Sequence, residues 1–99
     1  MSNRERNIGS DDSLPPELLV FPCDFPIKVM GKARDGFAQA IAAIVLKHAP
    51  DFNPATIEMR VSGKGNYISL TCTVFAVSRV QLDDLYRELS SHELVQIVL

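Results

Sequence analysis

The stretch that decides the fold runs from Tyr67 to Gln81 and reads Tyr-Ile-Ser-Leu-Thr-Cys-Thr-Val-Phe-Ala-Val-Ser-Arg-Val-Gln. In its first part every second residue is apolar, and most of the residues between carry a hydroxyl group. A period of two is typical of a strand, and two unequal faces indicate a sheet that is covered on one side only. We therefore predict a strand from Tyr67 to Val77, with two sets of side chains on opposite faces: Ile68, Leu70, Cys72 and Val74 toward the core, and Tyr67, Ser69, Thr71, Thr73 and Phe75 away from it.

A helix is predicted directly after this strand. Ser78 and Gln81 have the three-residue spacing of a capping box, which marks the start of a helix. The apolar residues that follow recur at helical spacing until the serines at 90 and 91: Leu82, Leu85, Tyr86 and Leu89.

Ahead of the deciding strand, Gly63-Lys64-Gly65-Asn66 predicts a hairpin turn, because these residues accept positive φ angles. The turn connects back to a second alternating strand, in which Ile57, Met59 and Val61 are expected to point inward and Glu58 and Arg60 outward.

The first part of the body repeats the pattern of strand and helix. Residues 24–31 alternate as a half-buried strand, and Pro26 is tolerable near its first residue, where a missing N–H has the least effect. Asp35 is expected to cap a helix that ends by Ala49, because Pro50 disfavours helical geometry in the residue before it. Its apolar stripe is Phe37, Ile41, Ile44, Val45 and His48.

A last strand, 94–99, completes the order βαββαβ. The predicted fold class is α+β: a ferredoxin-like plait, with a four-stranded antiparallel sheet and two helices on one face. Residues 1–16 are polar and read as a disordered N-terminal tail, which leaves 17–99 as the domain.

The composition narrows the function classes. Ten Lys and Arg residues against twelve Asp and Glu residues give a net charge of -2, which argues against sequence-independent binding of nucleic acid. No apolar stretch reaches the ~20 residues of a membrane span, and the N-terminus has no secretory signal, so we expect a cytoplasmic protein. Two cysteines without metal-ligand spacing predict neither a disulfide framework nor a metal site, and no cofactor motif is found.

Two glycine-bearing loops are the candidate ligand-binding residues. Gly31, Lys32 and Arg34 join the first strand to the first helix, where free N–H groups and two cations can hold a carboxylate or a phosphate. Lys64, between two glycines of the hairpin, can add an ammonium group, although the spacing is not that of a P-loop. The competing interpretation is that both loops carry ordinary solvated charge.

Residues suited to catalysis are few. His48, in the last turn of the first helix, suits a structural role on the carbonyl groups there, and His92 falls in a linker. Cys72 alternates with core residues, and Cys23 has no base near it in the sequence. We therefore predict that the chain is not an enzyme.

Two alternative functions stay open for a plait. A small hydrolase of acylphosphatase type has a glycine-bearing loop like Gly31–Phe37, but that family needs an arginine where this chain has Ala38. Single-stranded nucleic acid would bind on the open sheet face, through four residues: Lys28, Arg60, Tyr67 and Phe75.

Several motifs, in order and with matching spacing, resemble the YbeD-like family of small bacterial proteins: Leu19-Val20-Phe21-Pro22, Ile27-Lys28-Val29-Met30-Gly31, Lys47-His48-Ala49-Pro50, Ser62-Gly63-Lys64-Gly65-Asn66-Tyr67, Leu85-Tyr86-Arg87-Glu88-Leu89 and Val95-Gln96-Ile97-Val98-Leu99. That family has no established activity and is similar in fold to the ACT-type regulatory domain of phosphoglycerate dehydrogenase. The resemblance implies that domains pair and bind a small effector near the first strand-to-helix loop, which is here Met30 to Arg34.

The combined prediction is a non-catalytic, ACT-like regulatory module that binds a small anionic ligand or a protein partner. A homodimer is expected through the last strand, because its residues are apolar on both faces of an edge and such edges must be covered. These residues are Leu94, Val95, Ile97, Val98 and Leu99. A covering segment at 18–21 is the alternative.

Overall fold

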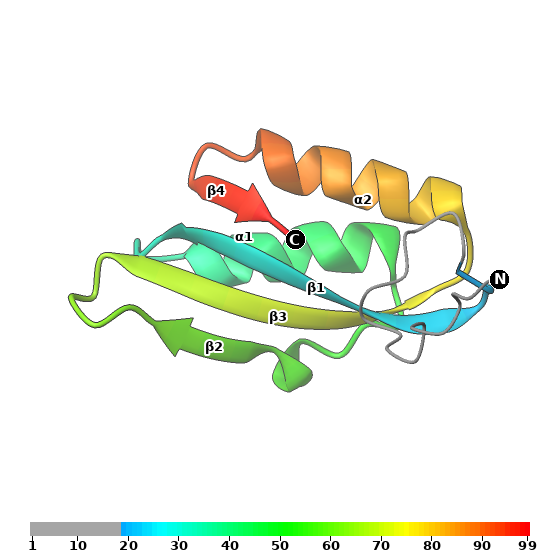
Figure 1. Cartoon of the computed structure of the whole chain (residues 1–99), viewed down its shortest axis with the longest axis horizontal. Helices are drawn as coiled ribbons and strands as arrows, with labels where there is room; N and C mark the ends of the chain where they lie inside the picture. Colours follow the sequence, from blue (N-terminus) through cyan, green and yellow to red (C-terminus); the bar gives the residue numbers. More distant parts are fainter. Residues whose placement is uncertain (1–18) are drawn as a thin grey trace, which may run out of the picture.

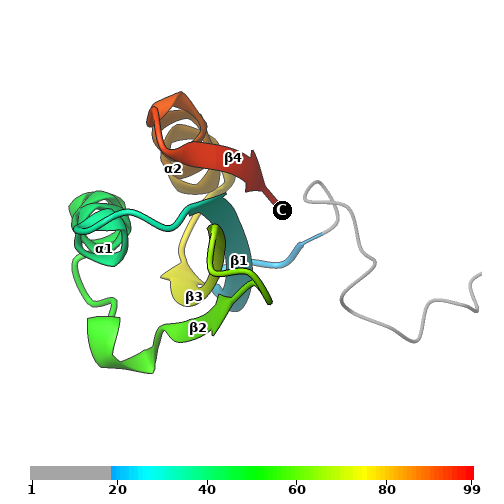
Figure 2. The ribbon, with the colours of Figure 1, turned by 90° about the vertical axis from the view of Figure 1, so that its left-hand side faces the viewer.

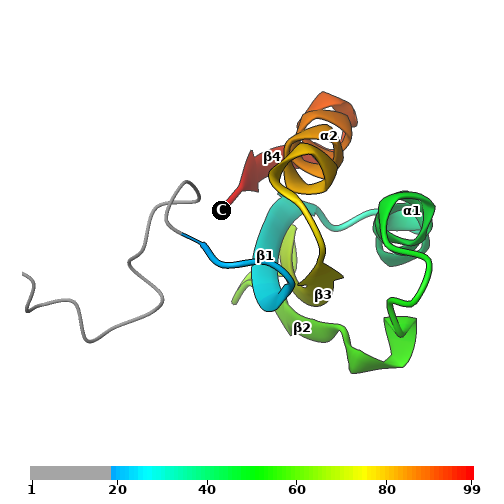
Figure 3. The same ribbon diagram turned by 90° about the vertical axis from the view of Figure 1, so that its right-hand side faces the viewer.

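The computed structural model describes residues 19–99, so the tail predicted for 1–16 lies outside the described residues. The elements are β1 (Cys23–Lys32), α1 (Phe37–His48), the 3-10 helix η4 (Pro54–Thr56), β2 (Glu58–Val61), β3 (Tyr67–Ala76), α2 (Arg79–Ser91) and β4 (Val95–Val98). The strands form one antiparallel sheet in the order β2-β3-β1-β4. Both helices cover the same face of it (Figures 1, 2 and 3). The predicted plait is confirmed.

The centre of the sheet is the long pairing of β1 with β3, which runs from Cys23 opposite Ala76 to Lys32 opposite Tyr67. Ile27 and Val29 of β1 are fully buried, and the predicted inward face of β3 is buried or half-buried. The helices complete the core with every third or fourth residue: Phe37, Ile41 and Val45 from α1, and Leu82, Leu85 and Leu89 from α2. Burial of these apolar side chains is the main force that holds the helices on the sheet.

The N-terminus of α1 differs from the prediction. Gly36 is the N-cap, with a φ of 84°, and no side chain caps the helix, so the expected role of Asp35 is wrong. The Phe37 N–H already donates to the Arg34 carbonyl at 3.1 Å, which forms a tight turn just before the helix. Glycine fits that turn because it has no side chain to clash at positive φ.

The other helix boundaries follow the sequence. The α1 helix ends at His48, one residue before Ala49, as predicted. In α2, the Ser78 hydroxyl accepts from the Gln81 N–H at 3.1 Å, which confirms the cap. The Gln81 side chain reaches one residue further back than a standard capping box, to the Val77 N–H at 2.7 Å.

The expected inward orientation of Met59 and Val61 did not lead to burial. Their side chains are 52% and 56% exposed, and all four residues of β2 are exposed. Their pairing partners, Leu70 and Ile68, lie on the helix-covered face, so Met59 and Val61 point to that face. The helices pack over β3, β4 and each other and leave β2 as an uncovered edge (Figure 2).

No helix within residues 19–99 is long and apolar enough to cross a membrane.

Candidate functional site

The structure brings the two predicted ligand-binding loops together at one end of the sheet. The Ala33 N–H donates to the Asn66 carbonyl at 2.9 Å, which joins the β1–α1 loop to the β2–β3 hairpin. Lys32 and Arg34 are the neighbours of Ala33, and Lys64 is two residues before Asn66. We call Lys32, Arg34 and Lys64 the basic end; it lies on the left in Figure 1.

The hairpin itself forms as predicted. The Ser62 N–H donates to the Tyr67 carbonyl at 2.9 Å, and the Ser62 hydroxyl accepts from the Tyr67 N–H at 3.2 Å. Gly65 adopts a φ of 78°, the left-handed geometry that the sequence led us to expect of this turn. Lys64 is exposed on the turn, so its ammonium group is free to meet a ligand from solvent.

Gly31 serves packing rather than ligand contact. It is buried, and a Cβ added there would meet the Leu94 carbonyl oxygen and the Phe37 ring, whose carbons would lie 2.6 and 2.8 Å away. The absence of a side chain therefore lets β1, β4 and α1 approach one another closely. The pairing of β1 with β4 shifts register between Met30 and Gly31, at the same place.

The N–H groups of Lys32, Ala33 and Arg34 are not free, which corrects the expectation for these three residues of the loop. The N–H of Lys32 donates to Leu94, that of Ala33 to Asn66 and that of Arg34 to Lys32, all to carbonyl oxygens within 2.9–3.0 Å. These three N–H groups are therefore not available to a bound anion, whereas the side chains of Lys32 and Arg34 are. Within residues 19–99, no carboxylate lies within 4.0 Å of the cationic groups of the basic end, so these charges are not neutralised by ion pairs there.

The open face of the sheet carries the four residues considered for nucleic acid. Lys28, Arg60, Tyr67 and Phe75 all lie on the face away from the helices, since their pairing positions alternate with the core residues. Tyr67 and Phe75, however, are eight residues apart on one strand, or roughly 26 Å at the usual rise of ~3.3 Å per residue. Two rings at that distance cannot stack on neighbouring bases, so the face does not form the aromatic platform of an RNA-recognition motif.

His48 takes part in a link between the two helices. Its Nε2 lies 2.8 Å from Glu88 Oε1, and Lys47 Nζ lies 3.1 Å from the same oxygen. These hydrogen bonds, first that of His48 and then that of Lys47, lower the pKa of Glu88. The Gln81 side chain donates to the His48 carbonyl at 2.9 Å. The partner predicted for His48 is therefore wrong: its ring binds a carboxylate of α2 rather than the carbonyl groups of its own helix.

The remaining candidates for chemistry have local partners or are buried. Burial raises the pKa of the Cys72 thiol to about 11, so the thiol stays protonated at neutral pH, as expected of a core residue. His92 Nδ1 accepts from the Leu94 N–H at 3.1 Å within the α2–β4 turn. Cys23 is half-buried at the start of β1.

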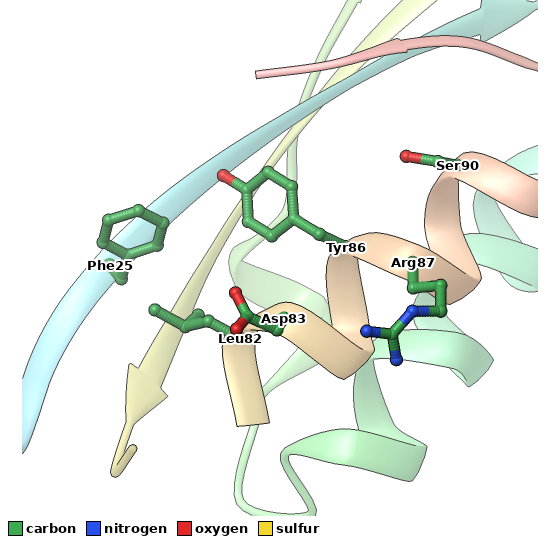
Figure 4. Close-up of a pocket in the computed structure, with 6 residues that line it drawn as sticks. All are labelled: Phe25, Leu82, Asp83, Tyr86, Arg87 and Ser90. Carbon is green, nitrogen blue, oxygen red and sulfur yellow. The ribbon is translucent and has the colours of Figure 1, made fainter. Parts of the chain in front are cut away.

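The sequence did not reveal a groove of about 440 Å³ between β1 and α2 (Figure 4). Its lining residues are Phe25, Leu82, Asp83, Tyr86, Arg87 and Ser90. The groove exists because β4 is short: β4 pairs with β1 only near Val29–Gly31, and the last backbone bonds join Lys28 to Leu99. The only signal in the sequence was the difference in length between the first and last strands.

Few groups in this groove are available for chemistry. The Tyr86 hydroxyl donates to the Leu99 carbonyl at 3.1 Å, and burial raises the pKa of Tyr86. Arg87 pairs with Asp84 at 2.9 Å, and Asp83 lies 3.8 Å from Arg79.

The groove also explains how β1 tolerates Pro26, which is not at the first residue of the strand. Backbone groups of Lys28 face β4, so two residues earlier the proline nitrogen faces the same, here unpaired, edge.

Comparison with known proteins identifies relatives and a fold. A family described as a protein of unknown function (DUF493) matches residues 16–99. The chain is 52% identical to a UPF0250 protein of Nitrosomonas europaea over 82 residues, 83% of this chain and 94% of that protein. It is 55% identical to a UPF0250 protein of Bordetella pertussis over 89 residues, 88% and 98% of the two chains.

Three solved structures share the fold at low sequence identity. Protein HP0495 from H. pylori has a TM-score of 0.68 at 14% identity, over 90% of this chain and 91% of that one. The ACT domain from the GTP pyrophosphokinase of Chlorobium tepidum has a TM-score of 0.57 at 21% identity, over 78% and 97%. The C-terminal domain of the MgtC protein from Mycobacterium tuberculosis has a TM-score of 0.58 at 19% identity, over 83% and 89%. With an ACT-like fold and relatives more than 50% identical, the chain belongs to the DUF493 family of proteins of unknown function, also called UPF0250, as its YbeD-like motifs led us to expect.

Proposed function

We propose that this protein is a non-catalytic, ACT-like module that binds a small anionic ligand at the basic end. The observation that carries the proposal is the Ala33–Asn66 hydrogen bond, which holds the β1–α1 loop and the hairpin together. It places three cations on two adjacent loops, with no carboxylate of residues 19–99 in an ion pair with any of them. Lysine and arginine side chains bind carboxylates and phosphates through charge-assisted hydrogen bonds.

The charge pattern favours a small ligand over a polymer. Glu58 and Lys28 flank Thr71 on the open face, and Asp24 lies opposite Phe75 near the far end of the same face. A nucleic-acid strand laid across the sheet would meet these carboxylates, and the net charge of -2 adds no general attraction. A ligand of a few atoms can be held at the basic end alone.

The non-catalytic part of the proposal rests on the groups that hydrolysis or transfer would need. The Cys72 thiol is buried and protonated, so it is not available as a nucleophile. The fold supports a regulatory role, because the similar ACT domain comes from a larger enzyme, a GTP pyrophosphokinase. A single domain of this kind would act on a separate protein once its ligand is bound.

The test is a titration followed by amide NMR spectra, with pyrophosphate, citrate, lipoate and free amino acids as probes. We expect at least one anion to shift signals of residues 32–36 and 62–67 in a saturable way. Lys64→Gln and Arg34→Gln should each weaken that binding about tenfold, in line with the loss of about one charge-assisted contact. Lys47→Gln, which changes a lysine on α1 far from these loops in sequence, should leave it unchanged.

Saturable binding whose shifts lie elsewhere, or which is indifferent to both basic-end variants, would remove the site. The absence of saturable shifts with every probe would reject small-anion binding, and a protein partner would then be the remaining form of the regulatory hypothesis.

A further inference from the structure

The outer edge of β2 is an unpaired sheet edge with an ordered pattern of side chains. No strand within residues 19–99 pairs with it (Figure 1). Met59 and Val61 are half-exposed on the helix-covered face, while Glu58 and Arg60 lie on the open face. Neither of these two charged residues forms an ion pair with a residue of 19–99.

The backbone groups on this edge are known from the pairing on the other side. The Ser62 N–H donates to the Tyr67 carbonyl, so the even-numbered residues of this segment direct their N–H and C=O groups toward β3. The odd-numbered residues Met59 and Val61 therefore direct theirs outward. The Ile57 carbonyl also faces outward, whereas its N–H already donates to Pro54 at 3.2 Å.

We propose that β2 pairs with β2 of a second copy of this chain, antiparallel and centred on Met59. In this register each Met59 exchanges both backbone hydrogen bonds with its counterpart, and each Val61 N–H donates to the partner's Ile57 carbonyl. The groups that can donate and accept across the pair are the ones left unpaired in the single chain. The apolar side chains Met59 and Val61 then face Met59 and Ile57 of the partner.

Charge complementarity selects this register. With Met59 on the two-fold axis, Glu58 of each copy lies opposite the partner's Arg60, so two opposite-charge pairs form by symmetry. These are non-hydrogen-bonded positions, where side chains of an antiparallel pair come closest. An axis through Arg60 would place two arginines face to face, and an axis through Glu58 would do the same with two glutamates. Like charges directly opposite destabilise a strand pair.

The β2 edge is better suited to self-association than the β4 edge that the sequence suggested. β4 (Val95–Val98) carries no charged side chain. Nothing in its sequence selects one register over another, and strands without such a signal are prone to slip. Ile97 and Leu99 are nevertheless apolar and 49% and 63% exposed at this edge. Pairing through the last strand therefore stays a prediction.

Sedimentation analysis across a concentration series tests the proposal, and circular dichroism checks that every variant is folded. We expect wild type to shift from monomer to dimer between tens of micromolar and millimolar concentrations, because a four-residue strand makes a small interface. Glu58→Arg and Arg60→Glu should each weaken the dimer about tenfold or more, since each places like charges opposite one another. The double variant Glu58→Arg/Arg60→Glu should dimerise again, because its pairs are opposite in sign.

A mixture of the two single variants supplies the sharpest control. One then carries two arginines and the other two glutamates at positions 58 and 60, so the mixture should form a heterodimer at concentrations where each variant alone is monomeric. Lys28→Glu, on the same face but on β1, should leave dimerisation unchanged. A wild type that stays monomeric throughout, or a folded double variant and mixture that do not regain the dimer, would overturn the proposal.

Discussion

The substitution Gly31→Ala should strongly destabilise the fold. The added Cβ would lie 2.6 Å from a ring carbon of Phe37, whereas ordinary contacts begin at 3.4 Å, so the ring would have to move by at least 0.8 Å, the difference between these distances. Phe37 is fully buried in the core, where close packing opposes such a movement. The other close neighbour, the Leu94 carbonyl, accepts from the Lys32 N–H at 3.0 Å, so shifting it weakens the pairing of β1 with β4.

The expected loss follows from these two obstacles. Overpacking a core usually costs about 1–3 kcal/mol, and simultaneous contact with a backbone carbonyl puts the cost of Gly31→Ala at about 3 kcal/mol. A domain of this size loses roughly 4–8 °C of melting temperature per kcal/mol, so the variant should melt roughly 12–24 °C below wild type. The assay is thermal and urea denaturation followed by far-ultraviolet circular dichroism.

The matched control is Gly63→Ala. A Cβ at Gly63 meets nothing within 4 Å, and Gly63 is not among the glycines with positive φ. Its melting temperature should stay near wild type or rise slightly, because alanine restricts the unfolded chain by about 0.4–1 kcal/mol. If Gly31→Ala melted as Gly63→Ala does, the close packing at Gly31 would not be a constraint on the fold, and its role in a ligand site would have to be reconsidered.

Three further predictions concern single side chains. Ser78→Ala should destabilise the protein by about 1 kcal/mol through loss of the α2 cap, measured by urea denaturation, and a change below ~0.3 kcal/mol would contradict that role. The pKa of Glu88 is lowered in the folded state, so the ionised side chain stabilises the fold at any pH above the ordinary glutamate pKa, and this stabilisation is lost as the pH falls through the folded pKa. Wild type should therefore lose more stability than Glu88→Gln between neutral pH and about pH 3. Equal losses would refute the link to His48. Native protein at neutral pH should react with a thiol reagent at Cys23 and not at Cys72, whose pKa is about 11, and mass spectrometry showing label on Cys72 without denaturant would contradict its burial.

The order of elements could be predicted because the strong sequence signals here are local. The alternation in β3 and the Ser78 cap each depend on residues close in sequence, and the structure confirms both. The start of α1 could not be assigned as well, because Asp35 and Gly36 both suit a helix N-terminus. The choice between them depends on the tight turn from Arg34 to Phe37, which connects β1 to α1.

Properties that depend on contacts between distant segments could not be predicted from the sequence. The alternation of β2 correctly places Met59 on the helix-covered face, but whether a helix covers it depends on where α1 packs. The partner of His48 is 40 residues away on α2, and no spacing rule connects the two. The hydrogen bond that unites the basic end likewise joins Ala33 to Asn66 across two elements. Sequence therefore identified the cations but not what brings them together.

Anion binding at the basic end and dimerisation through β2 depend on different residues. In the pairing centred on Met59, the strands run in opposite directions, so Lys64 of each copy lies five residues from the axis and on opposite sides of it. At the usual strand rise, each is on the order of 15 Å from the axis, and the two lie roughly 30 Å apart. That separation is several times the ~8 Å Debye length at physiological salt, so the two basic ends should not repel each other appreciably. Anion binding should thus be non-cooperative in the dimer. It should also survive in the Arg60→Glu variant at concentrations where that variant is monomeric, so either proposal can fail without the other.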